Sequence, residues 1–400
     1  MKSSLTIKKS DVLIFNLLTC WLLVDALNGF LLRTGFPISV SQIYKTIVAS
    51  IVIIRCINND KIVRITIIML LYLLLYLANI VLNDEDVGPS IVLLSRLLTS
   101  LLFFSYFLSI KRADYYFFQN KAFQIIKFSF FIFAINLILG SMGWGFKAYG
   151  GEDTSEGFGS RGFFYSMNEL SGVLAVLFAW AFYYCKKNFS KMKYLITSLV
   201  LFFLSYTLST KSGMAATIIF FLFITYFYGN KKEKIIIVVL SLLLLLSVGI
   251  VFEMLINSDL PVMIRFNYFI NKTDVITALT SSRLEYWADE GQIYYKSGFL
   301  SIIFGLGGNK TVEMDPYDAL LNCGLVGISF LIFLYVKCII TPIKKINNQN
   351  PFSKVVFVSN LLLVIISIGG GHILFSSMAG MLIALSNAFV FGKPQKVICK

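Results

Sequence analysis

The chain has 400 residues, of which 57% are hydrophobic and only 14% are charged. Its mean hydropathy is +0.79, whereas a soluble protein carries about 25% charged residues, so the composition excludes an ordinary soluble enzyme and indicates an integral membrane protein. The net charge of +14 would also suit a nucleic-acid-binding protein, but the distribution of the charges along the chain favours a different explanation.

Apolar runs of about 20 residues, long enough to cross a bilayer, recur along the whole chain. The N-terminal segment MKSSLTIKKS is basic and no small-residue cleavage site follows it, which predicts a first span rather than a cleaved signal peptide. The expected fold is an all-α polytopic membrane protein, with residues 1–400 in a single integral membrane domain. We expect about twelve transmembrane helices, near residues 11–32, 39–57, 65–83, 90–110, 123–142, 166–185, 194–209, 212–229, 235–256, 318–340, 354–369 and 373–391.

The basic residues predict the orientation of these spans. If the N-terminus is cytoplasmic, 24 of the 35 Lys and Arg residues fall in segments on the inner side, as the positive-inside rule predicts for a multi-pass protein of the cell membrane. Both termini are then cytoplasmic. This distribution explains the basic excess, so we expect no nucleic acid among the partners.

Two segments on the predicted outer side are long, residues 143–165 and residues 257–317. The larger contains SSRLEYWADEGQIYYKSGF, which predicts an amphipathic helix with Ser282 as its N-cap and Glu285 as the matching acid. The GLGGN that follows lacks the lysine pattern of a nucleotide-binding loop. The six cysteines show no zinc or disulfide spacing, and a single histidine excludes a multi-histidine site. We therefore predict no metal and no cofactor.

Three cations stand at the outer ends of predicted spans or in outer segments. Arg161 lies in GSRGFFYSMNEL, Lys211 lies in a turn of two or three residues within LSTKSG, and Arg283 opens the predicted helix of the large loop. Charges near membrane depth are costly and are candidates for function. Three cations on one face suit a phosphate-rich ligand, held by charge-assisted hydrogen bonds. The alternative is that they contact lipid headgroups or nearby acids.

Three carboxylates, Glu313, Asp315 and Asp318, precede an apolar run in TVEMDPYDALLNCGLVG. Asp315 is the predicted N-cap of the next helix and Asp318 its third residue, after Pro316 as the first, so capping is a sufficient reason for two of the acids. Glu313 lies outside this pattern. A carboxylate there, facing a cationic pocket, is a candidate general base.

His372 follows three glycines in GGGHILFSSM, in the predicted outer turn between the last two spans. It is either a hydrogen-bonded structural residue or a contact to substrate. The aromatic residues of the outer segments either stack on sugar rings or form the interfacial aromatic belt. Four polar residues within predicted spans are expected to be partners inside the bundle, although Glu169 has a capping box with Ser166 as an alternative: Asp25, Asn28, Asn136 and Glu169.

The order of these motifs resembles the O-antigen ligase and polymerase family, and more closely its capsular and exopolysaccharide polymerases. The resemblance covers most of residues 150–385. Its motifs are SRGFFYSMNEL, LSTKSG, SSRLEYW, EMDPYDALLNCGLVG and GGGHILFSSMAG.

The resemblance implies a multi-span glycosyltransferase that takes sugar chains from undecaprenyl diphosphate, without nucleotide or metal. It assigns Arg161, Lys211 and Arg283 to the diphosphate, and His372 to substrate binding. Ligases of the family carry a histidine about eleven residues before the glycine that is Gly324 here, where this chain has Glu313. That difference favours a polymerase in which Glu313, with Asp315 and Asp318, supplies the acid chemistry. Membrane lipid, a chain-length regulator and a flippase are further candidate partners.

Two other functions stay open. A ligase-type enzyme would transfer the finished glycan to a different acceptor. A transporter of lipid-linked oligosaccharides would usually show two similar halves, and the sequence shows no internal repeat.

Overall fold

The computed structural model describes residues 7–36, 38–56, 72–74, 76–78, 80–81, 87–149, 158–256, 283–307, 311–346, 350–373 and 375–392. Nearly all of this part of the chain is helical. The N-terminal half holds α1 (Lys9–Thr19), α2 (Trp21–Arg33), α3 (Val40–Cys56), α5 (Val87–Ala113) and α6 (Tyr115–Ser141). The remainder holds α7 (Met167–Asn188), α8 (Lys191–Leu208), α9 (Lys211–Tyr228), α10 (Lys231–Ile256), α13 (Arg283–Lys296), α14 (Phe299–Phe304), α15 (Asp315–Ile346), α16 (Ser353–Gly370) and α17 (Ser377–Ala388).

Among the described residues, seven helices are long and apolar enough to cross a membrane, or eight if the bent pair α1–α2 counts as one span. The expectation of an all-α polytopic membrane protein is therefore confirmed, while the count of twelve spans is not. Most of the predicted span at 65–83 lies outside the described residues. The last predicted span, 373–391, contains only the 12-residue helix α17.

The first predicted span is not one straight helix. α1 and α2 meet at Cys20 with a bend of 45°. The hydroxyl of Thr19 donates to the carbonyl oxygen of Phe15 at 2.9 Å, and such a bond from a Thr to the preceding turn often bends a helix. Hydropathy alone does not reveal this bend, because the residues before and after Cys20 are both apolar and together look like one continuous span.

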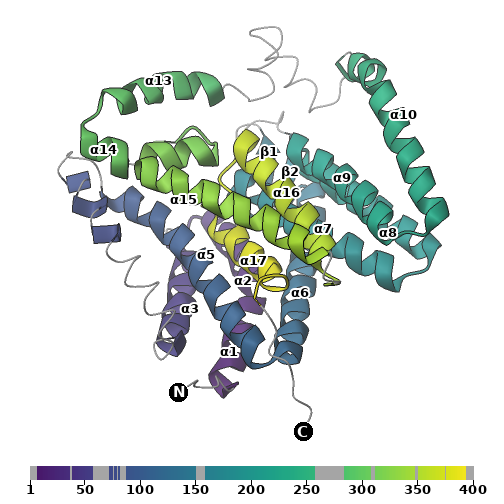
Figure 1. Cartoon of the computed structure of the whole chain (residues 1–400), viewed down its shortest axis with the longest axis horizontal. Helices are drawn as coiled ribbons and strands as arrows, with labels where there is room; N and C mark the ends of the chain where they lie inside the picture. The colour runs from purple at the N-terminus through teal and green to yellow at the C-terminus, as the bar shows by residue number, and fades with distance from the viewer. Residues whose placement is uncertain are drawn as a thin grey trace.

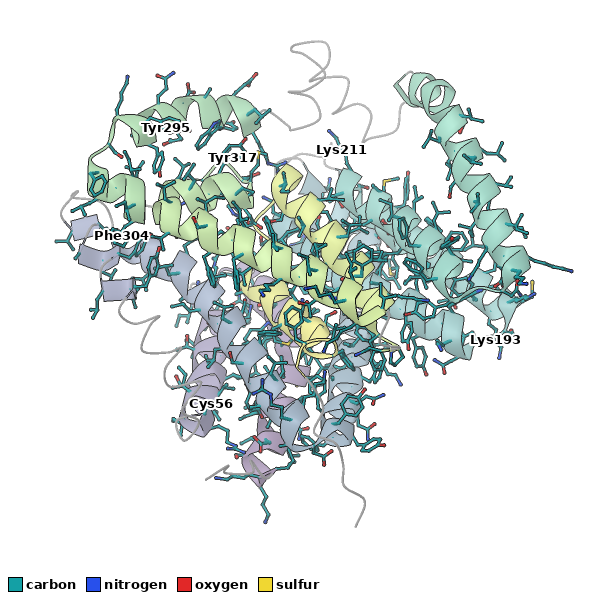
Figure 2. The ribbon with its side chains drawn as sticks, in the orientation of Figure 1. Cys56, Lys193, Lys211, Tyr295, Phe304 and Tyr317 are labelled. Atoms are coloured by element: carbon teal, nitrogen blue, oxygen red, sulfur yellow. The ribbon has the colours of Figure 1, made fainter. Side chains whose placement is uncertain are left out.

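The helices form a bundle around α7, the most buried of the candidate spans. α7 packs against α9, α16 and α17, and its Trp180 is buried among aromatic rings with its indole N–H on the Ser386 hydroxyl. Figure 1 shows α1 at the bottom of the bundle and α13 and α14 at the top. Figure 2 places Cys56 and Lys193 in the lower half, and Lys211 and Tyr317 in the upper half. The sequence predicts the first pair on the inner side and the second pair on the outer side.

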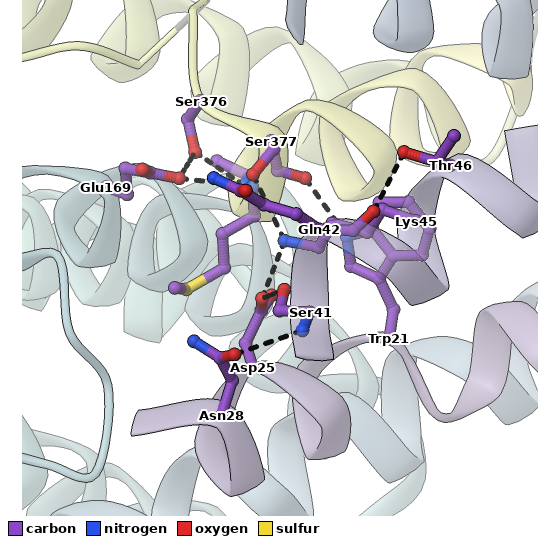
Figure 3. Close-up of polar contacts among 12 residues, drawn as sticks. Trp21, Asp25, Asn28, Ser41, Gln42, Lys45, Thr46, Glu169, Ser376 and Ser377 are labelled. Carbon is purple, nitrogen blue, oxygen red and sulfur yellow. Dashed lines mark hydrogen bonds and ion pairs between the residues drawn. The ribbon is translucent and has the colours of Figure 1, made fainter. Parts of the chain in front are cut away.

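Polar residues expected inside the bundle do find partners there, as Figure 3 shows. Asp25 contacts the Lys45 ammonium at 2.6 Å and accepts from the Ser41 hydroxyl at 2.5 Å. Glu169 accepts from the Ser376 hydroxyl at 2.5 Å and from the Met378 amide at 3.1 Å, at the start of α17. It does not form the alternative capping box, since Ser166 makes no side-chain capping bond.

A two-stranded antiparallel hairpin, β1 (Phe146–Tyr149) and β2 (Phe158–Gly162), lies in the segment 143–165 and was not expected from an all-α pattern. It docks on the end of α6. The side-chain oxygen of Asn136 accepts from the Phe163 amide at 2.9 Å, which confirms Asn136 as an interior partner. Gly162 has φ +59°, and a Cβ there would lie 2.2 Å from the Asn136 carbonyl oxygen, so only glycine permits this approach.

α15 is interrupted within its first three turns. Gly324 has φ 63° and ψ −160°, and a Cβ on it would lie 2.3 Å from the Ile303 carbonyl oxygen at the end of α14. The Leu306 amide donates to the Leu321 carbonyl oxygen at 2.7 Å. The break thus lets α14 and the residues after it pack into α15, which positions the acidic end of the large outer segment over the bundle.

Candidate functional site

Four of the predicted site residues, drawn from four separate segments, line one cavity of about 650 Å³. They are Arg161 on β2, Lys211 at the start of α9, Arg283 at the start of α13, and Glu313 just before α15. We call this the cation cavity. Its wall also includes the start of α7 and the end of α16. Its volume falls within the range of small-molecule sites, about 300–1,000 Å³.

Arg161 is held by the hairpin. Its guanidinium lies 4.9 Å from the centre of the Phe146 ring and 5.9 Å from that of Tyr165. It also donates to the carbonyl oxygen of Tyr165. Contacts to aromatic faces leave a guanidinium charged and fix its plane, so the strand presents a permanent positive charge to the cavity.

Lys211 stands in the tight turn that the sequence predicts between two spans. α8 ends at Leu208, and its C-cap Ser209 reverses the chain with a φ of 55°. Thr210 then caps α9 by accepting from the Gly213 amide at 3.1 Å. Lys211 is then the first residue of α9. The chain reversal at Ser209 and the helix cap at Thr210 therefore explain why a lysine can stand at the junction of two apolar helices.

Arg283 and Glu313 form an ion pair, with Arg283 Nη2 and Glu313 Oε2 3.0 Å apart. The two side chains are 15% and 49% exposed, so the pair faces the cavity with its carboxylate outermost. Glu313 has φ 60°, a backbone region that residues other than glycine rarely adopt. Glu313 lies outside the capping pattern, but it does have a structural partner, because it neutralises one of the three cations that line the cavity.

Asp315 and Asp318 do not line the cavity and are fully buried. Asp315 is not an N-cap, because α15 begins with it and the first helical hydrogen bond runs from the Asp318 amide to the Met314 carbonyl oxygen, at 2.9 Å. Its carboxylate instead accepts from the Ile373 amide at 3.1 Å and from the Ser367 hydroxyl. These bonds join the start of α15 to the last turn of α16 and to the turn after it, so the capping prediction missed a tertiary role.

Asp318 reaches back along the chain and across to His372. Its Oδ1 accepts from the Val312 amide at 2.6 Å, and its Oδ2 lies 3.1 Å from His372 Nδ1. Burial on its own would lower the pKa of His372, but the neighbouring carboxylates of Asp318, Asp315 and Glu313 raise the pKa above its ordinary value of 6.5. His372 thus carries positive charge more readily than a free histidine, just behind the cation cavity.

Asp315, Asp318 and His372 are also the group whose ligand atoms lie close enough for a metal ion, within 4.8 Å of one another in the described part of the chain. Both carboxylates already accept hydrogen bonds from backbone amides, and His372 contacts Asp318. These hydrogen bonds and the ion pair give the cluster a structural role, because they connect α15 to the turn after α16.

Several residues that line the cation cavity were not predicted from the sequence as site residues. Ser166, Asn168 and Ser171 from α7 and its cap, and Ser212 from α9, line the cation cavity, and the hydroxyls of Ser171 and Ser212 are 3.1 Å apart. In the sequence these are small polar residues at the ends of apolar helices. Such residues can cap a helix or line a binding site, and the sequence does not distinguish the two roles.

A family model described as O-antigen ligase like membrane protein matches residues 55–278, which is 224 of the 400 residues. The match includes Arg161 and Lys211 and ends before Arg283 and Glu313. No curated protein matches the chain.

Proposed function

This chain belongs to the family of O-antigen ligase like membrane proteins, and from that premise we propose that it is a polysaccharide polymerase. In this proposal it joins undecaprenyl-diphosphate-linked oligosaccharide repeat units on the outer face of the cytoplasmic membrane. The family supports a membrane protein that processes lipid-linked glycans. The polymerase reaction and the diphosphate donor are our own further step.

The observation that carries the proposal is the cation cavity. Arg161, Lys211 and Arg283 bring three positive charges from three segments to one space of about 650 Å³. A diphosphate bound there would accept charge-assisted hydrogen bonds from several donors at once. The same cations would stabilise the negative charge that develops on the diphosphate as it leaves, which lowers the barrier of the transfer without a nucleotide.

The Arg283–Glu313 pair suggests how binding prepares the reaction. An incoming diphosphate competes with the Glu313 carboxylate for the Arg283 guanidinium. Glu313, already half exposed to the cavity, is then free to accept the proton of the acceptor hydroxyl as a general base. The bond between the anomeric carbon and the diphosphate breaks, a glycosidic bond to the acceptor oxygen forms, and undecaprenyl diphosphate leaves.

The second candidate is a ligase-type transfer of the glycan to another acceptor, which the family description favours as it stands. The two reactions share the donor and the cations and differ in the acceptor. The carboxylate of Glu313, at the point where the resemblance expects a histidine in ligases, favours the polymerase.

Deleting the gene and separating the surface glycans on a gel tests the proposal. A polymerase predicts lipid-linked single repeat units and no ladder of longer chains, with the ladder restored by the intact gene. Accumulation of full-length polymer on lipid would instead identify a ligase. A normal ladder in the deletion strain would refute both reactions.

A further inference from the structure

The hairpin separates the cation cavity from a second cavity of about 650 Å³ on its other face. Register partners Lys147 and Ser160 line the second cavity, whereas their chain neighbours Ala148 and Arg161 line the first. Phe146 and Gly159 also line the second cavity, so each of the two short strands contributes residues to both cavities. Ser209, at the turn between α8 and α9, lines both.

The second cavity has a cationic and glycine-rich wall, and we call it the glycine cavity. Two cations line it, Arg33 at the end of α2 and Lys147 on β1. No carboxylate is among the described residues that line it. At one of its glycines a Cβ would meet no atom within 4 Å, namely Gly143, so a ligand can approach the backbone closely there. Four of the lining residues are glycines: Gly140, Gly143, Gly145 and Gly159.

One edge of the glycine cavity is apolar and faces outward. Phe203 and Tyr206 from the last two turns of α8 line it and are 55% and 49% exposed. Leu199 and Val200, on the same helix, are also exposed. In a helix with the length and hydropathy of a membrane span, exposed apolar side chains of this kind contact lipid tails. The cavity therefore joins a cationic pocket to a lipid-facing helix, which suits an anionic amphiphile rather than a free ion.

We propose that the glycine cavity binds the phosphate of a second undecaprenyl-linked glycan, the acceptor of the transfer. This inference rests on the proposed function, because a polymerase must hold two lipid-linked chains at once. The hairpin keeps the two phosphate groups apart, with Lys147 on one side and Arg161 on the other. The shared boundary at Ser209 places both ligands beside the α8–α9 turn.

The test counts bound lipid without requiring turnover. The purified full-length protein is titrated with undecaprenyl phosphate, which carries no sugar, and the bound molecules are counted by native mass spectrometry. We expect two molecules per wild-type chain. Lys147→Gln should weaken one of them by about tenfold, the loss of one charge-assisted hydrogen bond, and Arg283→Gln should weaken the other. Arg33→Gln repeats the Lys147 result, and double substitution at Lys147 and Arg283 should weaken both.

Lys296→Gln is the matched control, since Lys296 is exposed on α13 and lines neither cavity. It should leave two bound molecules. A single bound molecule that Lys147→Gln leaves unchanged would overturn the inference. Equal displacement by phosphatidylglycerol would assign the cavity to bulk anionic lipid and would overturn the acceptor role. Two specific molecules without chain extension would refute the polymerase and leave the second site standing.

Discussion

Glu313 and Arg283 form an ion pair at the cation cavity, and the proposed mechanism requires the negative charge of Glu313. Glu313→Gln keeps the shape of the side chain and removes the charge. If Glu313 is the general base, we expect turnover of purified enzyme to fall by about 10²–10⁴-fold. Stability should change little, because an ion pair with a half-exposed carboxylate contributes at most about 1 kcal/mol.

Asp289→Asn on α13 is the matched control, because Asp289 is an exposed acid of the same outer segment and does not line the cavity. Turnover of that variant should equal that of the wild type. Wild-type turnover in Glu313→Gln would remove Glu313 from the mechanism and leave it as the counterion of Arg283.

His372 makes the folding free energy depend on pH. Its carboxylate neighbours raise its pKa above 6.5 in the folded protein, so protonation favours the folded state. That stabilisation is fully present below pH 6.5 and is lost as the pH rises through the folded pKa. We expect thermal unfolding in detergent to occur at lower temperature as the pH rises through this window, and His372→Gln to flatten the profile. Since the chain has one histidine, an unchanged slope in the variant would rule out this cause.

At the scale of elements, the end of α16 shapes the cation cavity. Gly369 and Gly370 both line it, but they have different surroundings. A Cβ on Gly370 would lie 3.2 Å from Arg283 Nη1, whereas one on Gly369 would meet no atom within 4 Å. Gly370→Ala should therefore displace Arg283 and raise the KM for the lipid-linked donor several-fold, with Gly369→Ala as its control. Equal kinetics in both variants would show that Arg283 moves aside without consequence.

The elements that sequence predicts best here are those defined by apolar length. Most predicted spans coincide with helices such as α6, α7 and α9, because burying or lipid-exposing about 20 apolar residues leaves few alternatives. The hairpin, the bend at Cys20 and the break at Gly324 were not predicted. The hairpin and the break each depend on a close contact with another segment, such as Gly162 against Asn136, and a single sequence does not show which segments meet. The bend accompanies a local hydrogen bond from Thr19 to Phe15, which apolar length does not reveal.

At the scale of the whole molecule, the fold explains which site residues could be predicted from the sequence and which could not. Arg161, Lys211, Arg283 and Glu313 were singled out as charges beside apolar spans, and the fold gathers all four into one cavity. Asp315 and Asp318 carried the same signal but lie buried behind it. The difference arises from the turn after α16. Its Ile373 amide donates to Asp315, and its His372 ring contacts Asp318. Helix capping, a local rule, could not anticipate partners more than 50 residues away.

The proposed function depends on the orientation in the membrane, because it requires both cavities to open on the outer face, where the lipid-linked glycans would be joined. The positive-inside rule places α13 outside and the start of α8 inside, and the structure sets the two at opposite ends (Figure 2). Lys296→Cys on α13 should react with a membrane-impermeant thiol reagent in intact cells. Lys193→Cys on α8 should react only after the membrane is opened.

Both positions are exposed, so a difference in labelling reports the side of the membrane rather than burial. The native cysteines set the background, which the unmodified protein measures. Rapid labelling of Lys193→Cys in intact cells, with Lys296→Cys protected, would invert the topology. The cation cavity would then face the cytoplasm, where a polymerase of exported repeat units has no substrate, and the proposed function would fail with it.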